Sequence, residues 1–385
     1  MKEGWEYKKL SNICEILNGF AFKSSKYVSE GIRVIRITNV QKGRVEDSEP
    51  KYYPLSSKSE IERYLLKEGD LLLSLTGNVG RVGCLPPQLL PAALNQRVAC
   101  LRLKGNDINK QYLYHFLNSN YFENICIKNS SGAAQLNLST VWLSNYEIPV
   151  PSLSEQQSIV DYLDSAFAKI DVMKANAEKA LDEAKALFQA SLKEMLEPKE
   201  GWKEKKLGEM SEIQSGFAFK STQFQKRGDF QVIRMGNVRP GIIRYNESPV
   251  FIDSVDENII EKSLLKVGDM IITQTGSRNK RDYGFTVLID KEKLLLNQRI
   301  ARIRVVNTIT NKYLLYYSWT DYFRDQYFAN EGGTVGQGNV GIDAIRYAVI
   351  SYPSLSEQQS IVATLDSLKS KVDRLQENFD KISQE

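Results

Sequence analysis

Apolar residues recur in two stretches of the chain at alternating steps of four and three residues. The first stretch comprises Ile159, Leu163, Ala166, Ile170, Met173, Ala177, Ala180, Ala184 and Leu187, and the second comprises Ile361, Leu365, Leu368, Val372, Leu375, Phe379 and Ile382. Such a spacing is the heptad seam along which helices pack in coiled coils. The sequence therefore predicts two long helices, each with an apolar stripe that faces a partner.

Capping signals mark the predicted starts of these helices. Ser154 precedes Gln157 by three residues, and Ser356 precedes Gln359 in the same way, which is the spacing of a capping box. Pro198 and Gly201 bound the first helix at its far end. This helix of about 43 residues would span roughly 60 Å, whereas a compact domain measures roughly 40 Å across. Because domain termini often lie close together, we expect the second helix to run back antiparallel to the first.

The remaining sequence is typical of mixed strands and helices. Short β-rich runs such as 34–37 and 70–75 end in turn signals, and 232–235 and 269–273 repeat this pattern. Tyr, Leu and Phe then recur at helical spacing around 112–121 and 313–322. We therefore expect α+β domains.

The chain is an imperfect duplication. The run Gly19–Ser24 returns as Gly216–Ser221, Asn95–Arg97 returns as Asn297–Arg299, and Pro151–Val160 is identical to Pro353–Val362. A period near 200 residues indicates repeated domains, each followed by a connector. We predict a first globular domain at 1–152, a central helix at 153–197, a second domain at 198–353 and a C-terminal helix at 354–385, with the two domains related by a pseudo-twofold axis.

Charge separates the domains from the connectors. Residues 1–150 hold 19 Lys/Arg against 14 Asp/Glu, and residues 201–352 hold 22 against 17, so each part is +5. The connectors 151–200 and 353–385 are −4 and −2. Basic domains joined by acidic helices favour a polyanionic partner for the domains, although ordinary surface charge would also explain so mild an excess.

Several kinds of chemistry find little support. His115 is the only histidine, which argues against Ser-His or Cys-His catalysis and excludes metal sites built from several histidines. Four cysteines at 14, 84, 100 and 126 lack metal-binding spacing and are expected to be reduced thiols. Gly336–Gly341 matches a dinucleotide fingerprint but lacks the strand that should precede it. We predict a protein that catalyses nothing by itself, in the cytoplasm, with no membrane partner.

The motifs together closely resemble the specificity subunit of type I restriction-modification enzymes. Besides the repeats above, Gly4-Trp5 pairs with Gly201-Trp202, and Gly69-Asp70 pairs with Gly268-Asp269. The resemblance implies two target-recognition domains, each of which reads one half of an interrupted double-stranded DNA sequence. It also implies two antiparallel helices that set the gap and dock two methyltransferase subunits. Restriction subunits can join them, and S-adenosylmethionine, ATP and Mg are expected on those partners rather than on this chain.

The residues then divide into repeated and unrepeated candidates for DNA contact. The repeated ones are expected to fix the fold or contact phosphate: Lys23, Lys220, Arg36, Arg234, Arg97 and Arg299. The unrepeated ones lie in one loop that differs between the copies, and are candidates for base contact or plain solvated turns: Asn78, Arg81, Arg278, Asn279, Lys280 and Arg281. Arg44 and Arg244 are further candidates on predicted hairpins that follow Asn39 and Asn237.

Two alternatives stay open at this stage. A coiled-coil adaptor or scaffold could use basic domains to bind protein, and a specificity subunit of a type IIB-like system would carry nearly the same motifs. The C-terminal helix is also about two turns shorter than its partner, so a short natural tail, a trimmed chain or completion by another polypeptide would each fit.

Overall fold

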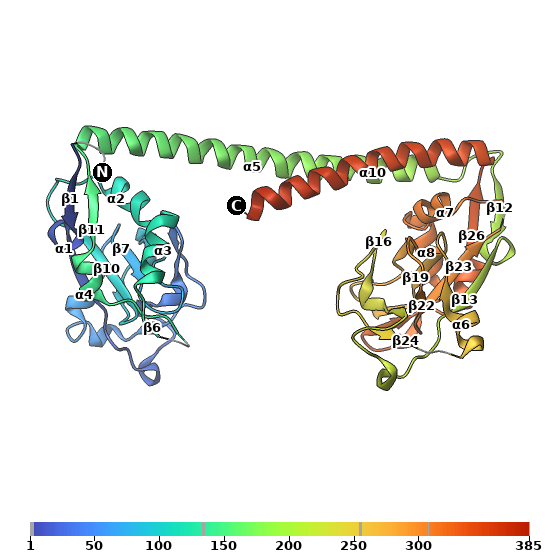
Figure 1. Cartoon of the computed structure of the whole chain (residues 1–385), viewed down its shortest axis with the longest axis horizontal. Coiled ribbons are helices and arrows are strands. Elements are labelled where there is room, and N and C mark those ends of the chain that lie inside the picture. The colour runs from blue at the N-terminus through green and yellow to red at the C-terminus, as the bar shows by residue number, and fades with distance from the viewer. Residues whose placement is uncertain (1–3, 133–134, 254–255, 307, 385) are drawn as a thin grey trace. The chain divides into compact units, whose positions relative to one another are not determined.

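Two units of similar construction make up the computed structural model, which describes residues 4–132, 135–253, 256–306 and 308–384. Contacts between residues divide the chain into unit 1, residues 1–171, and unit 2, residues 172–385. Figure 1 shows a body of strands and short helices in each unit. The boundary falls within helix α5 (Leu153–Leu196), so its first part belongs to unit 1 and its second part to unit 2.

Unit 1 begins with short strands and ends with helices and a last strand. Its elements are β1 (Glu6–Lys9), α1 (Leu10–Ile13), β2 (Cys14–Asn18), β3 (Ile32–Ile35), β4 (Val40–Gln41), β5 (Arg44–Val45), β6 (Tyr52–Tyr53), β7 (Leu71–Ser74), β8 (Val82–Cys84), β9 (Ala92–Leu94), β10 (Val98–Leu103), α2 (Lys110–Leu117), α3 (Asn120–Lys128), α4 (Thr140–Asn145) and β11 (Glu147–Val150). Short 3-10 helices lie at η1 (Ser24–Lys26), η2 (Ile37–Asn39), η3 (Leu55–Ser57), η4 (Glu62–Tyr64) and η5 (Pro87–Leu89).

Unit 2 repeats this order with small additions. Its elements are β12 (Lys203–Lys206), β13 (Ser211–Ser215), β14 (Phe230–Ile233), β15 (Val238–Arg239), β16 (Ile242–Ile243), β17 (Phe251–Ile252), α6 (Glu257–Ser263), β18 (Leu264–Leu265), β19 (Met270–Thr273), β20 (Thr275–Ser277), β21 (Thr286–Leu288), β22 (Leu294–Leu296), β23 (Ile300–Val305), α7 (Asn311–Tyr317), α8 (Asp321–Ala329), β24 (Gly332–Thr334), β25 (Gln337–Asn339), α9 (Ile342–Tyr347), β26 (Val349–Tyr352) and α10 (Leu355–Gln384). Its 3-10 helices are η6 (Leu207–Glu209), η7 (Ser221–Gln223) and η8 (Met235–Asn237).

Two sheets of unit 1 recur in unit 2, where the second gains one strand, β18. The order β2-β10-β7-β8 in unit 1 corresponds to β13-β23-β19-β21 in unit 2, and β6-β3-β9 corresponds to β17-β14-β22. In each unit the second of these sheets contains one parallel pair, β3 with β9 and β14 with β22. The duplication read from the sequence is thus a duplication of topology, and the prediction of two α+β domains with long helices is confirmed.

The period of two along the central strands explains how each sheet separates two cores. In unit 1, Leu71 and Leu73 pack with helices α2 and α3, whereas Leu72 between them packs in a second cluster. In unit 2, Met270 and Ile272 face one cluster and Ile271 faces the other. Successive side chains of a strand point to opposite faces, so the unbroken apolar runs after Gly69-Asp70 and Gly268-Asp269 cover both faces of a sheet.

A buried ion pair holds the start of each of these runs. Asp70 accepts two hydrogen bonds from Arg102, at 2.9 and 2.6 Å, and a third from the backbone amide of Lys67. In unit 2, Asp269 accepts two from Arg304, both at 2.7 Å, and a third from the amide of Lys266. The repeated Gly-Asp pair is therefore explained by a carboxylate that joins two neighbouring strands to the preceding turn.

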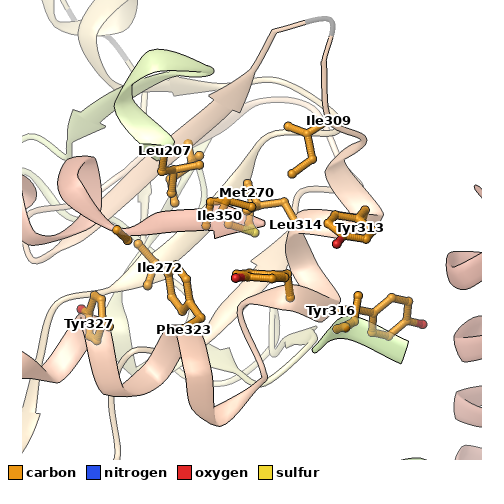
Figure 2. Packing of buried hydrophobic residues seen from close by; sticks show 14 of the residues in the cluster. Leu207, Met270, Ile272, Ile309, Tyr313, Leu314, Tyr316, Phe323, Tyr327 and Ile350 are labelled. Carbon is orange, nitrogen blue, oxygen red and sulfur yellow. The ribbon is translucent and has the colours of Figure 1, made fainter. Parts of the chain in front are cut away.

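The cores differ in composition. Figure 2 shows Phe323 and Tyr327 side by side in the core of unit 2, with ring centres 6.2 Å apart, and Tyr327 also donates a hydrogen bond to the carbonyl of Thr273. Unit 1 instead buries cysteines, and burial raises the pKa of Cys14 to about 12 and that of Cys126 to about 12. The cysteines are free thiols, as expected.

The helical stretch predicted in each domain is two helices rather than one. Ser119 accepts a hydrogen bond from the amide of Phe122 and so begins α3 directly after α2. Thr320 caps α8 in the same way, through the amide of Phe323. Side-chain oxygens that bond the backbone of the next turn favour the start of a new helix, and this signal lies within the periodic aromatic pattern.

The caps of the long helices lie two residues before the predicted ones. The hydroxyl of Ser152, not that of Ser154, accepts the amide of Glu155, and the hydroxyl of Ser354 accepts the amide of Glu357. Each helix is therefore capped by Ser152 or Ser354 instead of the predicted Ser154 or Ser356. The next residue, Gln156 or Gln358, is fully buried.

These two glutamines fasten each domain to its helix. The Gln156 side chain accepts the amide of Asn109 at 2.7 Å and donates to the carbonyl of Pro151 at 2.8 Å. The Gln358 side chain accepts the amide of Thr310 at 2.9 Å and donates to the carbonyl of Pro353 at 3.0 Å. The identity of the decapeptide in both copies thus reflects one repeated joint, which we call the glutamine joint.

The second part of α5 and the first part of α10 pack against one another within unit 2. Phe188, Leu192 and Leu196 of α5 share a buried cluster with Ile361 and Leu365 of α10. Leu368 and Val372 pack against the same cluster. Lys185, Phe188 and Gln189 of α5 line one cavity with Lys369, Val372, Asp373 and Gln376 of α10. Figure 1 shows the end of α5 beside the start of α10, so the two helices run antiparallel here.

The predicted seam is displaced by one residue in this part of α5. Leu187 is 57% exposed, whereas Phe188 is buried, and Leu181 is buried beside the predicted Ala180. Leu and Phe bury more apolar area than the alanines of the predicted seam, and an α-helix also drifts relative to a strict heptad. Elsewhere in the seam, Ile159, Leu163, Leu375 and Phe379 are partly buried, and Ile170, Met173 and Ile382 are exposed. Glu385, the last residue of the predicted C-terminal helix, lies outside the described residues.

Candidate nucleic-acid interface

Two repeated motifs meet at one corner of each unit. In unit 1 the amide of Phe20 bonds the carbonyl of Leu94 at 2.8 Å, and the amide of Gln96 bonds the carbonyl of Phe20 at 3.0 Å. In unit 2, Phe217, Leu296 and Gln298 repeat both bonds. Glycine is required before the phenylalanine, because a Cβ on Gly19 or Gly216 would collide with the carbonyl of the facing asparagine. The Gly-Phe-Ala-Phe-Lys loop and the Asn-Gln-Arg turn are therefore one structural element.

This corner presents two of the predicted cations to solvent. Lys23 and Lys220 are exposed at the starts of η1 and η7. Arg97 and Arg299 are exposed as well, while their carbonyls accept amides from the ends of the buried runs, Leu75 and Gln274. The backbone carbonyls of these arginines thus take part in the fold, and the Arg299 guanidinium also donates to the Thr275 hydroxyl at 3.4 Å.

The third repeated cation, Arg36 or Arg234, is held more firmly. Arg36 bonds the carbonyl of Glu49 at 2.6 Å, and Arg234 bonds the carbonyl of Ser248 at 2.5 Å. Their backbone amides donate to Asn39 and Asn237 at 3.0 Å. These arginines hold the loop after the hairpin in place, so their first role is structural.

Unit 2 has a cavity of about 350 Å³ beside this loop. It is lined by Arg234, Met235, Gly236, Asn237, Glu247, Ser248, Asn297, Gln298 and Arg299. Two of the predicted cations, Arg234 and Arg299, therefore line the same cavity.

The predicted hairpins exist in both units, as β4 with β5 and β15 with β16. Arg44 lies on β5 and pairs with Glu46 at 2.5 Å, and Arg244 follows β16 and pairs with Glu247 at 3.1 Å. Both arginines are largely exposed. Exposed ion pairs of this kind contribute little to stability, so either arginine could exchange its carboxylate for a phosphate.

The unrepeated loop of unit 1 is short. Asn78 is exposed at the turn after β7, and its carbonyl accepts a hydrogen bond from the Ser74 hydroxyl at 2.5 Å. Arg81 donates to the side chain of Gln41 on β4 at 2.7 Å. Gln41 is not among the candidates that the sequence indicates, and only the structure shows that it lies beside this turn.

The corresponding loop of unit 2 is longer, and its four predicted residues differ in role. Arg278 lies 3.3 Å from a carboxylate oxygen of Glu331 and donates to the carbonyl of Gly332 at 2.8 Å. Arg281 lies over the ring of Phe328, with its guanidinium carbon 5.0 Å from the ring centre. Asn279 and Lys280 are exposed. Arg278 therefore holds this loop against residues 331–332, and the side chains of Asn279, Lys280 and Arg281 form its solvent-facing part.

The dinucleotide-like pattern Gly336–Gly341 does not form a nucleotide site. Gly338 lies within β25, and the strand-turn-helix geometry of that fingerprint is missing around it. Among residues 4–132, 135–253, 256–306 and 308–384, no group of three or more His, Cys, Asp or Glu side chains could hold a metal ion. His115 lies 2.8 Å from Asp164 of α5, through its Nε2, and stacks on Phe167. No helix within these ranges is long and apolar enough to cross a membrane.

Comparison with known proteins agrees with this duplicated architecture. The family described as "Type I restriction modification DNA specificity domain" matches residues 2–182 and again residues 199–383. The chain belongs to this family. The resemblance drawn from the motifs is therefore confirmed, together with the interpretation as a type I specificity subunit with two target-recognition domains rather than an unrelated adaptor.

Curated relatives and solved structures support the same assignment. The EcoBI specificity subunit of Escherichia coli is 24% identical over 97% of this chain and 81% of that protein. The MjaVIII specificity subunit of Methanocaldococcus jannaschii is 31% identical over 46% of this chain, a match that spans only 43% of that protein. A chain from a type I restriction-modification complex is similar in fold, with a TM-score of 0.73 and 17% identity over 100% of this chain and 96% of that one. The HsdS subunit of Thermoanaerobacter tengcongensis gives a TM-score of 0.64, again at 17% identity, over 100% and 95%.

Proposed function

We propose that each unit binds one half of a two-part double-stranded DNA target. The observation that carries this proposal is the pairing of a repeated framework with an unrepeated loop at the same place in both units. Exposed Lys23, Lys220, Arg97 and Arg299 on the shared corner suit contacts with phosphate, which fix position without reading sequence. The loops around Asn78 and Lys280 differ, as expected of side chains that select bases.

The long helices would set the distance between the halves and dock two methyltransferase subunits. Support comes from the family and from the exposed apolar residues of α5, such as Ile170, Val172 and Met173, because exposed apolar side chains in a row suit a protein partner. Restriction subunits would join through those partners. This chain would be non-catalytic, with S-adenosylmethionine, ATP and Mg bound by the partner subunits.

Methylation mapping tests the proposal directly. The chain is co-expressed with its neighbouring methyltransferase, and methylated DNA positions are compared with those made by the methyltransferase alone. We expect a new adenine-methylated motif in two parts that depends on this chain. Absence of chain-dependent methylation, with both proteins folded and associated, would contradict the proposal and favour an adaptor.

A seven-residue deletion within α5 tests the role of the helices. Removing residues 170–176 shortens the helix by about 10 Å and rotates the residues after the deletion by only about 20° about the helix axis. The permitted gap should change, or binding should be lost. The matched control keeps the length and replaces Ile170 and Met173 with Ala. A deletion variant that keeps the original gap preference would overturn the ruler role while leaving DNA recognition intact.

A further inference from the structure

A glycine-rich hairpin in unit 2 ends in a valine that is fully exposed to solvent. Strands β24 and β25 pair Gly332 with Asn339 and Thr334 with Gln337, so the turn consists of Val335 and Gly336 alone. Gly336 has a φ of +86°, a conformation that favours glycine. Val335 projects at this tip with its whole side chain accessible.

The hairpin is braced on the basic loop described above. Strand β20 pairs with β25 up to Ser277 and Gln337, and the amide of Arg278 then bonds the carbonyl of Gly336 at 3.2 Å. Arg278 also pairs with Glu331, whose carboxylate accepts a hydrogen bond from the buried Tyr283 hydroxyl. Burial and that hydrogen bond raise the pKa of Tyr283, so the phenol stays protonated as a donor. The hairpin tip and the loop of Asn279, Lys280 and Arg281 therefore form one end of a three-stranded sheet.

Unit 1 has the base of this hairpin and a shorter sequence between its two sides. Thr76 donates to Asn137 at 3.2 Å, as Thr275 donates to Asn339 at 2.9 Å. Ser131 faces Asn137 in unit 1 as Gly332 faces Asn339 in unit 2, so unit 1 has residues 131–137 where unit 2 has residues 332–339, which is one residue more. Residues 133–134 lie outside the described residues. The longer segment occurs in unit 2 alone. A feature that reads one half-site is expected to be present in only one of the two units.

The shape and chemistry of this end of unit 2 fit the major groove of DNA. That groove admits a two-stranded β-ribbon and displays the C5 methyl of thymine, the apolar group that small apolar side chains contact there. The exposed cations beside the tip suit the flanking phosphates. We infer that the β24–β25 hairpin enters the major groove of the half-site bound by unit 2 and that Val335 contacts a thymine methyl. This inference rests on the proposed function and names the residue that would read one base pair.

Thymine-to-deoxyuridine substitution tests the contact, because it removes only the methyl group. The complex of the full chain with its methyltransferase is titrated with duplexes of the mapped target in which each thymine, on either strand, is replaced in turn. For the natural chain, one position in one half-site should lose affinity about 3- to 10-fold. Val335→Ala should lose a similar factor on the unmodified target and should no longer respond to that substitution.

Controls separate this contact from other causes. Val267→Ala changes an exposed valine of the turn before β19, away from the hairpin sheet, and should bind as the natural chain does. Thermal unfolding checks that Val335→Ala folds. Equal affinities for Val335→Ala and the natural chain would overturn the inference, and so would a mapped half-site for unit 2 that contains no A·T pair. A natural complex with no sequence preference at all would instead overturn the proposed function.

Discussion

Unit 1 and unit 2 carry the same buried ion pair, the same glycine-supported corner and the same glutamine joint. They differ where turns reach solvent: unit 1 has the turn of Asn78, and unit 2 has the loop of Lys280 beside the Val335 hairpin. Residues that recur in both copies are mostly those whose hydrogen bonds hold backbone together. The comparison teaches that in this chain repetition marks the framework and divergence marks the surface that would choose between DNA sequences.

The attachment of the helices shows how far the framework can vary. Asp164 of α5 meets His115, whereas Asp366 of α10 accepts a hydrogen bond from Tyr316 at 2.7 Å and pairs with Lys312. The aspartates hold equivalent places in the two helices. Near the surface, the two units thus use different side chains to bind the equivalent aspartate of the long helix. At the buried position they use the same residue, Gln156 or Gln358.

Removing the buried carboxylate of Asp70 or Asp269 should give the largest loss of stability, and the loss should be equal in the two units. Asp70→Ala or Asp269→Ala leaves an arginine and a backbone amide without their acceptor, and should lower the free energy of unfolding of the affected unit by about 3 kcal/mol. Urea unfolding followed by tryptophan fluorescence measures this, since Trp5 and Trp142 report on unit 1 and Trp202 and Trp319 on unit 2. Costs that differ severalfold between units would break the idea of a shared framework.

The glutamine joint should give the next largest effect. Gln156→Ala and Gln358→Ala each leave buried backbone groups unpaired and should cost about 2 kcal/mol. Gln359→Ala is the matched control, because this neighbour is exposed. Gln157→Ala is not used, because Gln157 accepts a hydrogen bond from the side chain of Asn109 at 2.8 Å. Amide exchange at Asn109 and Thr310 should rise only in the first pair of variants, and unchanged protection there would argue against the joint.

Alkaline pH should weaken unit 1 before unit 2. The pKa of an unfolded thiol is about 8.5, below the raised values for Cys14 and Cys126. Above pH 8.5 the unfolded chain releases protons that folded unit 1 retains, so the free energy of unfolding falls, by about 1 kcal/mol for each thiol at pH 9. Unit 2 has no cysteine, and its buried tyrosines, such as Tyr313, whose pKa is also raised by burial, matter only from about pH 10.

Urea unfolding at pH 7.5 and pH 9, read separately for the two units, measures the difference. Burial also raises the pKa of Cys100 in unit 1. Replacing Cys14, Cys100 and Cys126 with Ala should therefore remove the fall in the free energy of unfolding of unit 1 between these two pH values. Equal sensitivity of both units at pH 9 would show that the thiols are not the cause.

The smallest effect is expected at the surface anchors of the helices. Asp164→Ala should cost less than about 1 kcal/mol, because the carboxylate is more than half exposed. Asp366→Ala, which also strands the Tyr316 hydroxyl, should cost about 1 kcal/mol. The same urea experiment measures both variants. A larger loss of stability for Asp164→Ala than for Asp366→Ala would contradict this prediction.

The duplication, the two long helices and the α+β class could be predicted because each rests on a pattern that spans many residues. The helix starts could not be fixed from sequence, since Ser152 and Ser154 both precede an acceptable capping partner by three residues. The structure shows that Ser152 caps the helix, in a turn where Gln156 is buried. The predicted seam is misplaced for a similar reason: a regular row of alanines satisfies the heptad, while Leu181 and Phe188 beside it offer more area to bury.

The candidate DNA-contacting residues could likewise be predicted only in part. Charge and divergence between the two copies identify the basic loop of unit 2, but the sequence cannot show that Arg278 is paired with Glu331 while Lys280 is exposed. In the sequence the hairpin is only a poor match to a nucleotide motif. The sequence does show four glycines around one valine, in a segment one residue longer than its counterpart, but the role of this segment becomes clear only when β20 is seen to pair with β25.

The glutamine joint has a consequence for how such chains can be recombined. A decapeptide that caps a helix, turns the chain and bonds the preceding domain through one side chain acts as a standard coupling. Because the coupling is identical in both copies, a domain exchanged together with its own decapeptide would arrive on the new helix in the orientation it had before. New combinations of half-sites could then arise by cassette exchange, without any redesign of the helix that receives them.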